Sequence, residues 1–371
     1  MKILCVGGGS MGRRRLRDLT HLGAGDIALF EPNPERCQQV SRQFGVRGYS
    51  DFSAALTEEP ELMTISAPPA LHEPYVRAAL DRNLHVFAEV PFVLDLEAME
   101  DVARRARGYR KTIGISAAPR FYPPFRVISD LLGRGEIGKP LYCEYSLGNF
   151  LPDWHPYEDY RKFYAGDMRM GGVGLDMIPH EWITIGAWLG PVESVYARLT
   201  KLSNLEINGP DNHDVLMTFA NGCRGYFHND VIERGTQGRH IRIVGDQGTI
   251  EWHQNLPYVR FYDGRVNQAS EFAFDTISDW SDAITASRQV TELLNRQKAP
   301  SGKIPTSGSD HFVYESCYLR EMKHFVDAVS GKHPYQLATP EEELHSVRTF
   351  HAILRSSDEK REVKVGEVSR Q

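Results

Sequence analysis

A glycine-rich stretch near the N-terminus, Gly7-x-Gly9-x-x-Gly12, constrains this 371-residue chain more than any other feature. It follows the short apolar run KILCV (2–6) and precedes a helical pattern at 11–22. Glycines placed between a strand and a helix allow a tight turn, and they let an anionic pyrophosphate approach the helix N-terminus. The alternative is a glycine-rich turn in an unrelated α/β fold, but this context favours a dinucleotide-binding site.

The first third of the chain alternates between apolar runs and helical patterns. Further strands are predicted at 26–30, 61–67, 85–90 and 112–117, and helices at 33–45, about 73–83 and 95–108. Such alternation is typical of a parallel, doubly wound sheet, and short apolar runs fit strands that are buried on both faces. We therefore predict an α/β chain with an N-terminal Rossmann domain over residues 1–121.

Glu31 ends the second predicted strand, nineteen residues after Gly12. An acid at this position accepts hydrogen bonds from the adenosine ribose and repels a 2′-phosphate, so NAD is favoured over NADP. Arg13, Arg14 and Arg15 follow the glycines, and we interpret them as a solvated helix face. If one of them reaches a phosphate, the preference for NAD becomes weaker.

Three later strand ends should line the same cleft, because ligands bind at the carboxyl ends of strands in open α/β sheets. These are SAPPALH (66–72), AEVP (88–91) and SAAPRF (116–121). His72 either lies near the nicotinamide or caps its own helix. The predicted cofactor-binding residues are Gly7, Gly9, Ser10, Met11, Gly12, Glu31, Ala67, Pro68, His72, Glu89 and Val90.

After residue 121 the pattern changes to a helix at about 123–134 and then a series of strands up to residue 264. Turns at Asn221-Gly222, 246–248 and Asp263-Gly264 fit antiparallel hairpins. Helices are predicted at 311–331 and 339–357. We therefore predict a substrate-binding and oligomerisation domain over 122–371, with a large, mainly antiparallel open sheet. Helix 339–357 is a candidate to pack back on the first domain.

The stretch GGVGLDMIPHEW (171–182) holds the candidate catalytic residues. Asp176 and His180 are four residues apart, so a helix places both on one face. Histidine titrates near neutral pH, so it can take the proton of a sugar hydroxyl as a hydride moves. Pro179 would distort this helix unless it lies in the first turn. The alternative for His180 is a structural role, buried against Trp182.

The loop LPDWHPYEDYRKFYA (151–165) supplies candidate sugar contacts. Trp154 and Tyr157 offer apolar faces to a sugar ring, and the Arg161 guanidinium can hold a carboxylate or a phosphate. The alternative is a long loop that packs against the sheet. The predicted substrate-binding residues are Arg120, Trp154, Tyr160, Arg161 and Lys162.

Composition argues against several classes of function. A net charge of −6 gives no basic surface for nucleic acid, and no apolar run approaches the 18 residues of a membrane span. The five dispersed cysteines include no CxxC pair, which indicates reduced thiols, no zinc site and no predicted metal. The apolar stretch at the N-terminus is too short for a signal peptide, so we expect a cytoplasmic protein.

In combination these residues resemble the glucose–fructose oxidoreductase / inositol dehydrogenase (Gfo/Idh/MocA) family over essentially the whole chain. The matching pieces are VGGGSMGRR, Glu31, SAPPALH, Glu89 with Pro91, Arg120-Phe121, GEIGKP and GGVGLDMIPHEW. The resemblance implies NAD(P)-dependent oxidation or reduction of a sugar or polyol carbon, in dimers or tetramers built through the second-domain sheet. The loop at 151–165 is similar to that of a subgroup associated with surface-polysaccharide and amino-sugar metabolism.

Two positions depart from the family's pattern. The resemblance implies Glu-Lys-Pro at 89–91, with a lysine that stabilises the alkoxide and relays the proton together with the Asp and the His. This chain has Val90, which neither donates a hydrogen bond nor carries a charge. Ala118 likewise stands where the family often has Asn. Loss of the lysine would cost about 10²–10⁴-fold in rate unless another residue replaces it. The candidates are Tyr160, Arg161, Lys162 and Tyr164.

Three functions therefore stay open. The first is a sugar dehydrogenase with His180 as acid/base and with Asp176 and Tyr164 as further catalytic residues. The second is an NAD-dependent, redox-neutral glycosidase or lyase, and the third is an NAD-binding protein without turnover. The expected partner is a small-molecule sugar rather than nucleic acid or a membrane, and the expected assembly is a homodimer or homotetramer.

Overall fold

The computed structural model describes residues 1–154, 159–162, 164–234, 238–254, 256–273 and 308–368. The chain divides into two compact units. Among the described residues, the N-terminal unit contains 1–118 and 308–344, and the second, here named the sheet unit, contains 119–273 and 345–368.

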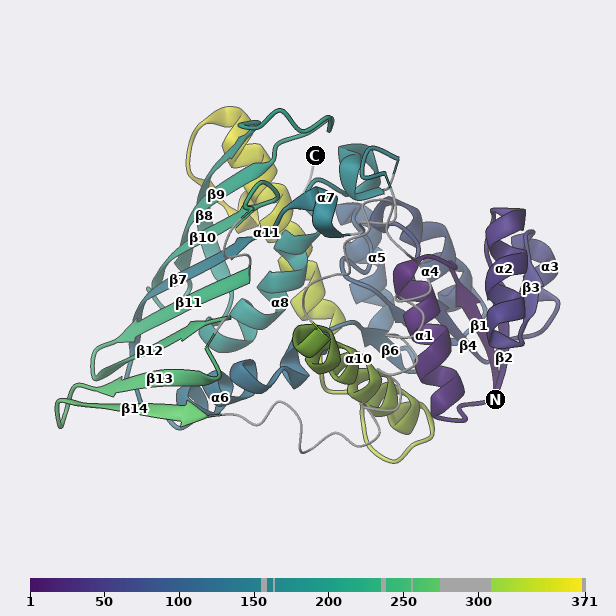
Figure 1. The fold of residues 1–371 in the computed structure, drawn as a ribbon, viewed down its shortest axis with the longest axis horizontal. Helices are drawn as coiled ribbons and strands as arrows, with labels where there is room; N and C mark the ends of the chain where they lie inside the picture. The colour runs from purple at the N-terminus through teal and green to yellow at the C-terminus, as the bar shows by residue number, and fades with distance from the viewer. Residues whose placement is uncertain (155–158, 163, 235–237, 255, 274–307, 369–371) are drawn as a thin grey trace. The chain divides into compact units, whose positions relative to one another are not determined.

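Six parallel strands form the sheet of the N-terminal unit, in the order β3-β2-β1-β4-β5-β6 (Figure 1). This order reverses next to β1, as in dinucleotide-binding sheets. The strands are β1 (Lys2–Val6), β2 (Asp26–Phe30), β3 (Arg47–Tyr49), β4 (Leu62–Ile65), β5 (His85–Ala88) and β6 (Ile113–Ile115). The helices are α1 (Ser10–His21), α2 (Pro34–Phe44), α3 (Phe52–Leu56), α4 (His72–Asp81), α5 (Leu96–Ala106) and α10 (Gly308–Val329), with a 3₁₀ turn at Pro69–Leu71.

Local signals in the sequence explain where these helices begin and end. The Asn33 side chain accepts a hydrogen bond from the Arg36 N–H at the start of α2, and Gly45 ends that helix with a φ of +67°. Asp95 caps α5 in the same way. The strands and helices predicted for this part of the chain are confirmed. β3 and α3 were not predicted, because three residues (RGY) do not make an apolar run.

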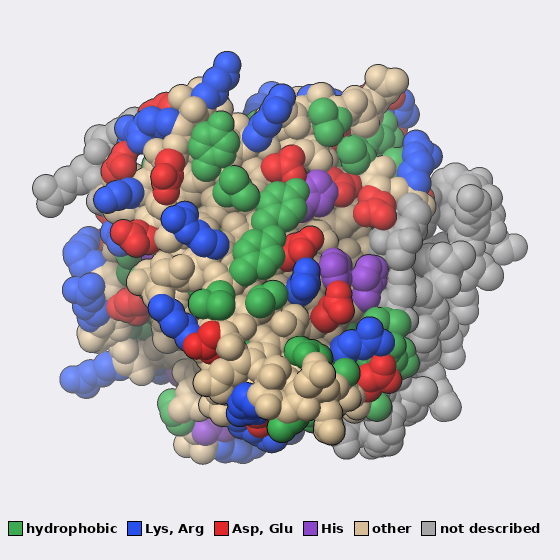
Figure 2. All heavy atoms as spheres, turned by 90° about the vertical axis from the view of Figure 1, so that its left-hand side faces the viewer, with side chains coloured by type: hydrophobic (Ala, Val, Ile, Leu, Met, Phe, Trp, Pro, Cys, Tyr) green, Lys and Arg blue, Asp and Glu red, His purple; other side chains and the backbone are tan. Residues whose placement is uncertain are grey.

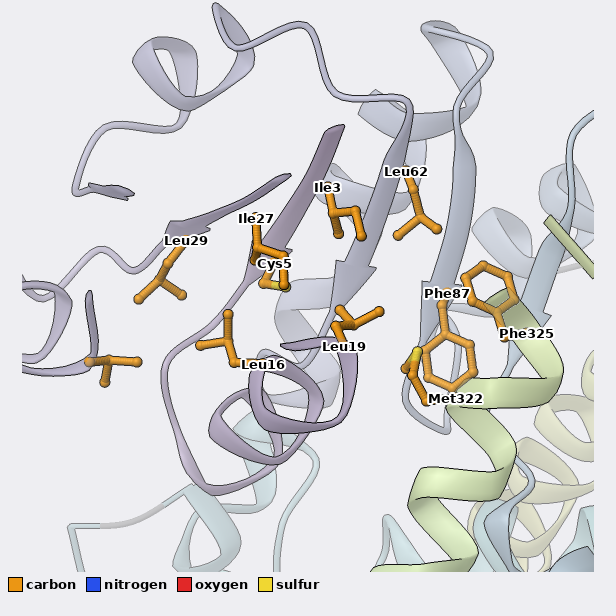
Figure 3. Close-up of a cluster of buried hydrophobic side chains, with 11 residues drawn as sticks. Ile3, Cys5, Leu16, Leu19, Ile27, Leu29, Leu62, Phe87, Met322 and Phe325 are labelled. Atoms are coloured by element: carbon orange, nitrogen blue, oxygen red, sulfur yellow. The ribbon is translucent and has the colours of Figure 1, made fainter. Parts of the chain in front are cut away.

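The core of the N-terminal unit joins α10 to the sheet. Side chains of β1, β2, α1 and β5 pack with Met322 and Phe325 of α10, and the rings of Phe87 and Phe325 are 5.1 Å apart (Figure 3). The division of the chain therefore differs from the expected boundary at residue 121. Residues 308–344, which the sequence assigned to the second domain, group with the first because α10 completes this core.

Nine strands form the sheet of the sheet unit, in the order β14-β13-β12-β11-β7-β10-β9-β8-β15 (Figure 1). The pair β7/β10 is parallel and the other pairs are antiparallel. The strands are β7 (Pro140–Gly148), β8 (Val192–Thr200), β9 (Asn212–Phe219), β10 (Arg224–Asp230), β11 (Gly238–Gly245), β12 (Gly248–His253), β13 (Tyr258–Asp263), β14 (Gln268–Ala273) and β15 (Val363–Lys364). The predicted fold class is thus confirmed.

Helices cover one face of this sheet (Figure 1). They are α6 (Pro123–Gly133), α7 (Leu151–Trp154), α8 (Met177–Leu189) and α11 (Pro340–Glu359), with 3₁₀ turns at Ala118–Phe121, Tyr164–Gly166, Met168–Met170 and Val365–Val368. α11 begins with the reciprocal hydrogen bonds of a capping box between Thr339 and Glu342. Its first turn groups with the N-terminal unit, where the Glu343 carboxylate accepts a hydrogen bond from Phe92 N. Among the described residues, no helix is both long and apolar enough to cross a membrane.

Candidate active site

The glycine turn, residues 7–12, joins β1 to α1. Gly7 has a φ of +97°, and a Cβ on Gly12 would lie 1.9 Å from the Gly7 carbonyl oxygen, so both positions require glycine. Gly9 differs, because no described atom lies within 4 Å of the position that its Cβ would take. Gly9 is the cap residue of α1, and as a glycine it offers no side chain to cap the first N–H groups of this helix. This helix start can therefore receive an anion.

Glu31 lies beside the glycine turn at the end of β2. Its buried carboxylate accepts hydrogen bonds from Gly8 N (2.8 Å) and Asn33 N (2.9 Å). A carboxylate held here can also accept from ribose hydroxyls, as the predicted role requires. The half-exposed Arg36 guanidinium lies 3.8 Å from the same carboxylate. Arg36 was not predicted as a site residue, and its positive charge beside Glu31 opposes the preference for NAD that Glu31 creates.

Arg13 and Arg14 lie near the glycine turn and make local contacts. Arg13 Nε donates to the Gly8 carbonyl (3.2 Å), and the Arg14 guanidinium stacks 4.4 Å from the centre of the Tyr318 ring. The interpretation of all three arginines as a solvated helix face is wrong for Arg15, which is fully buried. Arg15 projects from the inner face of α1, the face that carries Leu16 and Leu19 into the core.

Arg15 is the centre of a buried ion cluster in the N-terminal unit. Its guanidinium binds Glu89 through two hydrogen bonds (2.6 and 3.0 Å) and Glu321 of α10 through one (2.7 Å), and it also donates to Ser116 (3.1 Å). Burial alone would raise the pKa of Glu89, but Arg15 outweighs burial and holds that pKa below its usual range. Burial raises the pKa of Glu321. Glu89 therefore fixes the ends of β5 and β6 through Arg15.

His72 and Val90 lie in the segments that follow β4 and β5. His72 is fully buried, and its ring nitrogens lie 2.7 Å from the Ala67 carbonyl and 2.9 Å from the Pro91 carbonyl. His72 therefore connects the Ala67-Pro68 segment to the Val90-Pro91 segment, and burial lowers the pKa of its ring. Val90 is nearly buried, and the Val90–Pro91 peptide bond is cis.

In the sheet unit, the candidate catalytic residues gather at the start of α8. Asp176 is the cap residue of α8, and Pro179 lies in the first turn, where proline is tolerated. The Tyr164 hydroxyl donates to Asp176 Oδ2 at 3.1 Å. A Cβ on Gly172 would lie 2.2 Å from the Tyr164 carbonyl oxygen, so this glycine lets the two segments approach. The structure thus brings Tyr164 and Asp176 together, one helical turn before His180.

Asp176 is buried, and burial raises its pKa to about 6 although the hydrogen bond from Tyr164 and the charge of His180 act in the opposite direction. Its Oδ1 atom is buried without a hydrogen-bond partner among the described residues. A carboxyl group with this pKa exchanges its proton near neutral pH. An unpartnered oxygen at the same group suits a ligand that brings a hydroxyl.

His180 makes a contact that the sequence did not predict. Its Nδ1 lies 3.1 Å from Oε1 of Glu181, the next residue in α8. Glu181 is fully buried and is also bound by Arg239 (2.6 Å) and by the Tyr145 hydroxyl. One signal was available, because Glu181 is an acid within the apolar segment MIPHEWITIGAWL. About a fifth of the His180 side chain is exposed (21%), so the ring is open to a ligand on one side.

The predicted substrate residues fall into two groups. Trp154, Tyr160 and Tyr164 pack around a small apolar cluster in the sheet unit. Arg161 is exposed and already paired with Asp159 and Glu206, and Lys162 is exposed. Arg120 donates to the Ile183 carbonyl of α8 at 3.3 Å. Tyr157 lies outside the described residues. Of the four candidates to replace the missing lysine, Tyr164 is the one bound to Asp176.

Residues 1–116 match the family described as "Oxidoreductase family, NAD-binding Rossmann fold", and residues 125–251 match the "GFO/IDH/MocA C-terminal domain". The chain belongs to the Gfo/Idh/MocA family. The resemblance inferred from the sequence is thereby confirmed, and the protein is an oxidoreductase with an NAD-binding Rossmann fold.

Relatives in this family extend over the whole chain. Myo-inositol 2-dehydrogenase from Thermotoga maritima is 23% identical, over 99% of each chain. An oxidoreductase from Agrobacterium radiobacter, solved with NAD+, L-tartaric acid and magnesium, has a TM-score of 0.77 at 20% identity, over 99% of each chain. Levoglucosan dehydrogenase, solved with NADH, has a TM-score of 0.77 at 16% identity, over 98% of this chain and 99% of that one. At these identities the two solved structures show the fold alone.

The N-terminal unit fits the dinucleotide of this family. The uncapped start of α1 and the space next to Gly9 suit a pyrophosphate, and the Glu31 carboxylate is placed for a ribose. The choice between NAD and NADP rests on two opposite charges, Glu31 and Arg36. Among the described residues, no group of His, Cys, Asp and Glu side chains is arranged to hold a metal ion.

Proposed function

We propose that this member of the Gfo/Idh/MocA family is an NAD-dependent dehydrogenase of a sugar or sugar derivative, with His180 as the acid/base. The observation that carries the proposal is the polar group at the start of α8. Tyr164 is bound there to Asp176, and the partly exposed His180 follows one helical turn later. The names of two relatives, a myo-inositol dehydrogenase and a levoglucosan dehydrogenase, support a polyol or sugar substrate.

In this proposal each side chain has one task. His180 Nε2 takes the proton from the reacting hydroxyl, or returns it to the ketone in the reverse direction. Asp176 Oδ1, which has no partner among the described residues, accepts a hydrogen bond from a neighbouring substrate hydroxyl. Bound NAD would supply the acceptor or donor for the hydride. The apolar cluster around Trp154 and Tyr160 offers a wall for the ring carbons.

Tyr164 is our proposal for the group that replaces the missing lysine at Val90. Its hydroxyl is held by Asp176, whose pKa of about 6 allows the pair to pass a proton near neutral pH. We expect Tyr164→Phe to lower kcat by about 10²-fold or more, within the range of a general acid/base. Lys162→Met, a change on the exposed part of the same loop, should leave kcat unchanged. A low kcat in Lys162→Met together with an unchanged kcat in Tyr164→Phe would assign the role to Lys162.

The decisive experiment measures NADH formation at 340 nm over a panel of sugars and polyols, with NAD affinity measured in parallel. We expect turnover in the wild-type protein, and His180→Ala should abolish it while the Kd for NAD stays within a factor of two. Full activity of this variant would reject His180 as the acid/base. Substrate cleavage that needs NAD but yields no net NADH would instead identify a lyase or glycosidase. Tight NAD binding with neither outcome would identify a protein without turnover.

We further propose NAD as the physiological cofactor. The Glu31 carboxylate is buried and held by a backbone N–H group, whereas the Arg36 side chain is long and half-exposed, so binding a phosphate would cost it rotamer entropy. A comparison of the Kd values for NAD and NADP tests this choice. None of the five cysteines, all of them buried, forms a disulfide, which supports a reducing compartment and hence the cytoplasm.

We also propose a homodimer or homotetramer built through the open face of the sheet unit. One row of side chains crosses this face, and cross-strand pairing places its members opposite one another. The row begins with apolar and aromatic side chains and continues with alternating charges: Tyr196, Leu216, Tyr226, Glu144, Arg242, Glu251, Arg260 and Glu271. Figure 2 shows hydrophobic side chains gathered near the centre of this side of the molecule.

Leu216 tests this assembly, because it is a large apolar residue that is 55% exposed. Leu216→Arg should convert the oligomer to a monomer in light-scattering measurements and leave the thermal unfolding of the monomer intact. Val266→Arg is a matched control, since Val266 is equally exposed (60%) in the turn between β13 and β14. A wild-type monomer at micromolar concentration would reject the proposal.

A further inference from the structure

The feature that the proposed mechanism leaves unexplained is a buried carboxylate in α8. Glu181 has no exposed surface, and it lies in a helix whose other buried residues are almost all apolar. A buried charge is costly unless it is paired and hydrogen-bonded. Replacing such a buried pair as a whole by apolar residues is often neutral or stabilising, so the pair of Glu181 with Arg239 need not be present for stability.

Four donors surround the two oxygens of Glu181. Oε1 accepts from Arg239 (2.6 Å) and faces His180 Nδ1 (3.1 Å), while Oε2 accepts from Arg239 Nε (3.1 Å) and from the Tyr145 hydroxyl. These donors come from three elements, namely β11, β7 and α8 itself. Tyr145 is fully buried and stacks on Phe227, so the arrangement is fixed by the core of the sheet.

We propose that Glu181 is a positioning residue for His180: it accepts the Nδ1 proton and thereby presents an unprotonated Nε2 to the substrate hydroxyl. The tautomer of a neutral histidine follows the hydrogen bond made by its other nitrogen, so a fixed acceptor at Nδ1 selects the form with a basic Nε2. Among the described residues, no side chain or backbone group bonds Nε2. This inference rests on the acid/base role proposed for His180.

Glu181 acts as an anion in this arrangement and does not take up the proton itself. Burial by itself would raise the pKa of Glu181, but the positive charge of Arg239 and the hydrogen bond from His180 outweigh burial and hold the pKa well below its usual range. A permanent negative charge beside the ring stabilises the imidazolium that forms when Nε2 takes a proton. Among the described residues, the titratable groups nearest His180 include Glu181 and Asp176, together with their partners Arg239, Tyr145 and Tyr164.

The tautomer of His180 can be measured without any substrate. In ¹⁵N-histidine-labelled protein, comparison with His180→Gln identifies the signals of this ring among the fourteen histidines. We expect the neutral ring to carry its proton on Nδ1 in the wild-type protein. We expect Glu181→Gln to lower the population of that tautomer, because a side-chain amide offers one acceptor where the carboxylate offers two. A wild-type ring with its proton on Nε2 would overturn the proposal.

The kinetic test uses the same variants together with a matched control. With a turned-over substrate, Glu181→Gln should lower kcat by about 10²-fold and move the acid limb of the pH–rate profile to lower pH, while the Kd for NAD stays unchanged. Asp211→Asn is the control, since Asp211 is an equally buried carboxylate in the sheet unit, paired with Lys201 at 2.8 Å. It removes the charge of a buried carboxylate that lies outside α8, so the His180 tautomer and the pH profile should stay as in the wild type.

A second variant keeps the test conclusive if Glu181→Gln fails to fold. The double change Glu181→Leu with Arg239→Leu removes both buried charges, and such apolar replacements are commonly neutral or stabilising. It should fold, bind NAD and show the same change of tautomer and of kcat. An unchanged tautomer and pH profile in the folded double variant would reduce Glu181 to a structural ion pair. A changed tautomer in a protein without turnover would support the positioning role and reject only the proposed reaction.

Discussion

The change Asp176→Asn should alter how the stability of the protein depends on pH. Burial raises the pKa of Asp176 from 3.8 to about 6. Because the folded-state pKa is the higher one, the carboxyl group contributes stability that is fully present below its unfolded pKa and is lost as the pH rises through about 6. One pKa unit corresponds to about 1.4 kcal/mol. Between about pH 4.5 and pH 8, the wild type should therefore lose about 2 kcal/mol relative to the variant.

The prediction concerns how the difference in unfolding free energy between the wild type and Asp176→Asn changes with pH. A difference that is the same at every pH does not affect it. The variant places an amide where Asp176 Oδ1 has no hydrogen-bond partner among the described residues. A buried unsatisfied amide costs about 1–3 kcal/mol, but it does so equally at every pH. Tyr164 can still donate to the amide oxygen. The Asp176 carboxyl group can therefore exchange a proton near neutral pH, and it lowers the free energy of unfolding in the same pH range.

Urea unfolding at a series of pH values measures the effect. Tryptophan fluorescence reports mainly on the relevant part of the chain, because Trp154, Trp182, Trp188 and Trp252 belong to the sheet unit. Tyr164→Phe is a useful companion, since it keeps the carboxyl group and removes a hydrogen bond that lowers its pKa. It should steepen the loss of stability with pH. A difference between wild type and Asp176→Asn that stays constant from pH 4.5 to pH 8 would refute the reasoning.

Two further predictions concern the N-terminal unit. Gly12→Ala places a Cβ 1.9 Å from a backbone oxygen and should unfold the glycine turn, which circular dichroism measures. Gly9→Ala places a Cβ where no described atom lies within 4 Å, so this variant should fold normally but bind NAD at least 10-fold more weakly, which titration calorimetry measures. Arg15→Met leaves Glu89 and Glu321 buried without their cation and should lower the free energy of unfolding by about 3–5 kcal/mol, measured in urea at pH 7. A loss below 1 kcal/mol would show that the two carboxyl groups are satisfied without Arg15.

Much of the fold was predictable because its signals are local. The glycine turn, the Asn33 cap and the hairpin turn at Gly222 each lie within a few residues of the element that they define. The grouping of α10 with the N-terminal unit was not predictable in this way. Phe325 packs against Phe87, and nothing in the sequence near either residue indicates a partner more than 200 positions away.

In the candidate site, too, local spacing was predictable from the sequence and contacts between distant segments were not. The four-residue spacing of Asp176 and His180 indicated their common face, and the structure places both at the start of α8. Tyr164 could only be one of four candidates, since the backbone path of the loop decides which side chain reaches Asp176. The prediction that Arg15 is solvent-exposed was wrong, because a run of three arginines is typical of an exposed helix face. Its position three residues after Gly12 and four before Leu19 was the available signal that it faces inward.

Two acids of these sites have a property in common, although the sequence predicted a role for Glu89 and none for Glu181. Glu89 precedes Val90, and Glu181 follows His180, so each acid is adjacent to another candidate site residue. Each is neutralised by an arginine far along the chain, 74 positions away for Arg15 and 58 for Arg239. A buried carboxylate is costly unless it is paired or hydrogen-bonded. An acid inside an apolar segment, next to a candidate catalytic residue, therefore predicts a distant buried cation even where the sequence cannot say which one. Glu181 meets both conditions in the sequence alone, since it follows His180 and lies in an apolar segment.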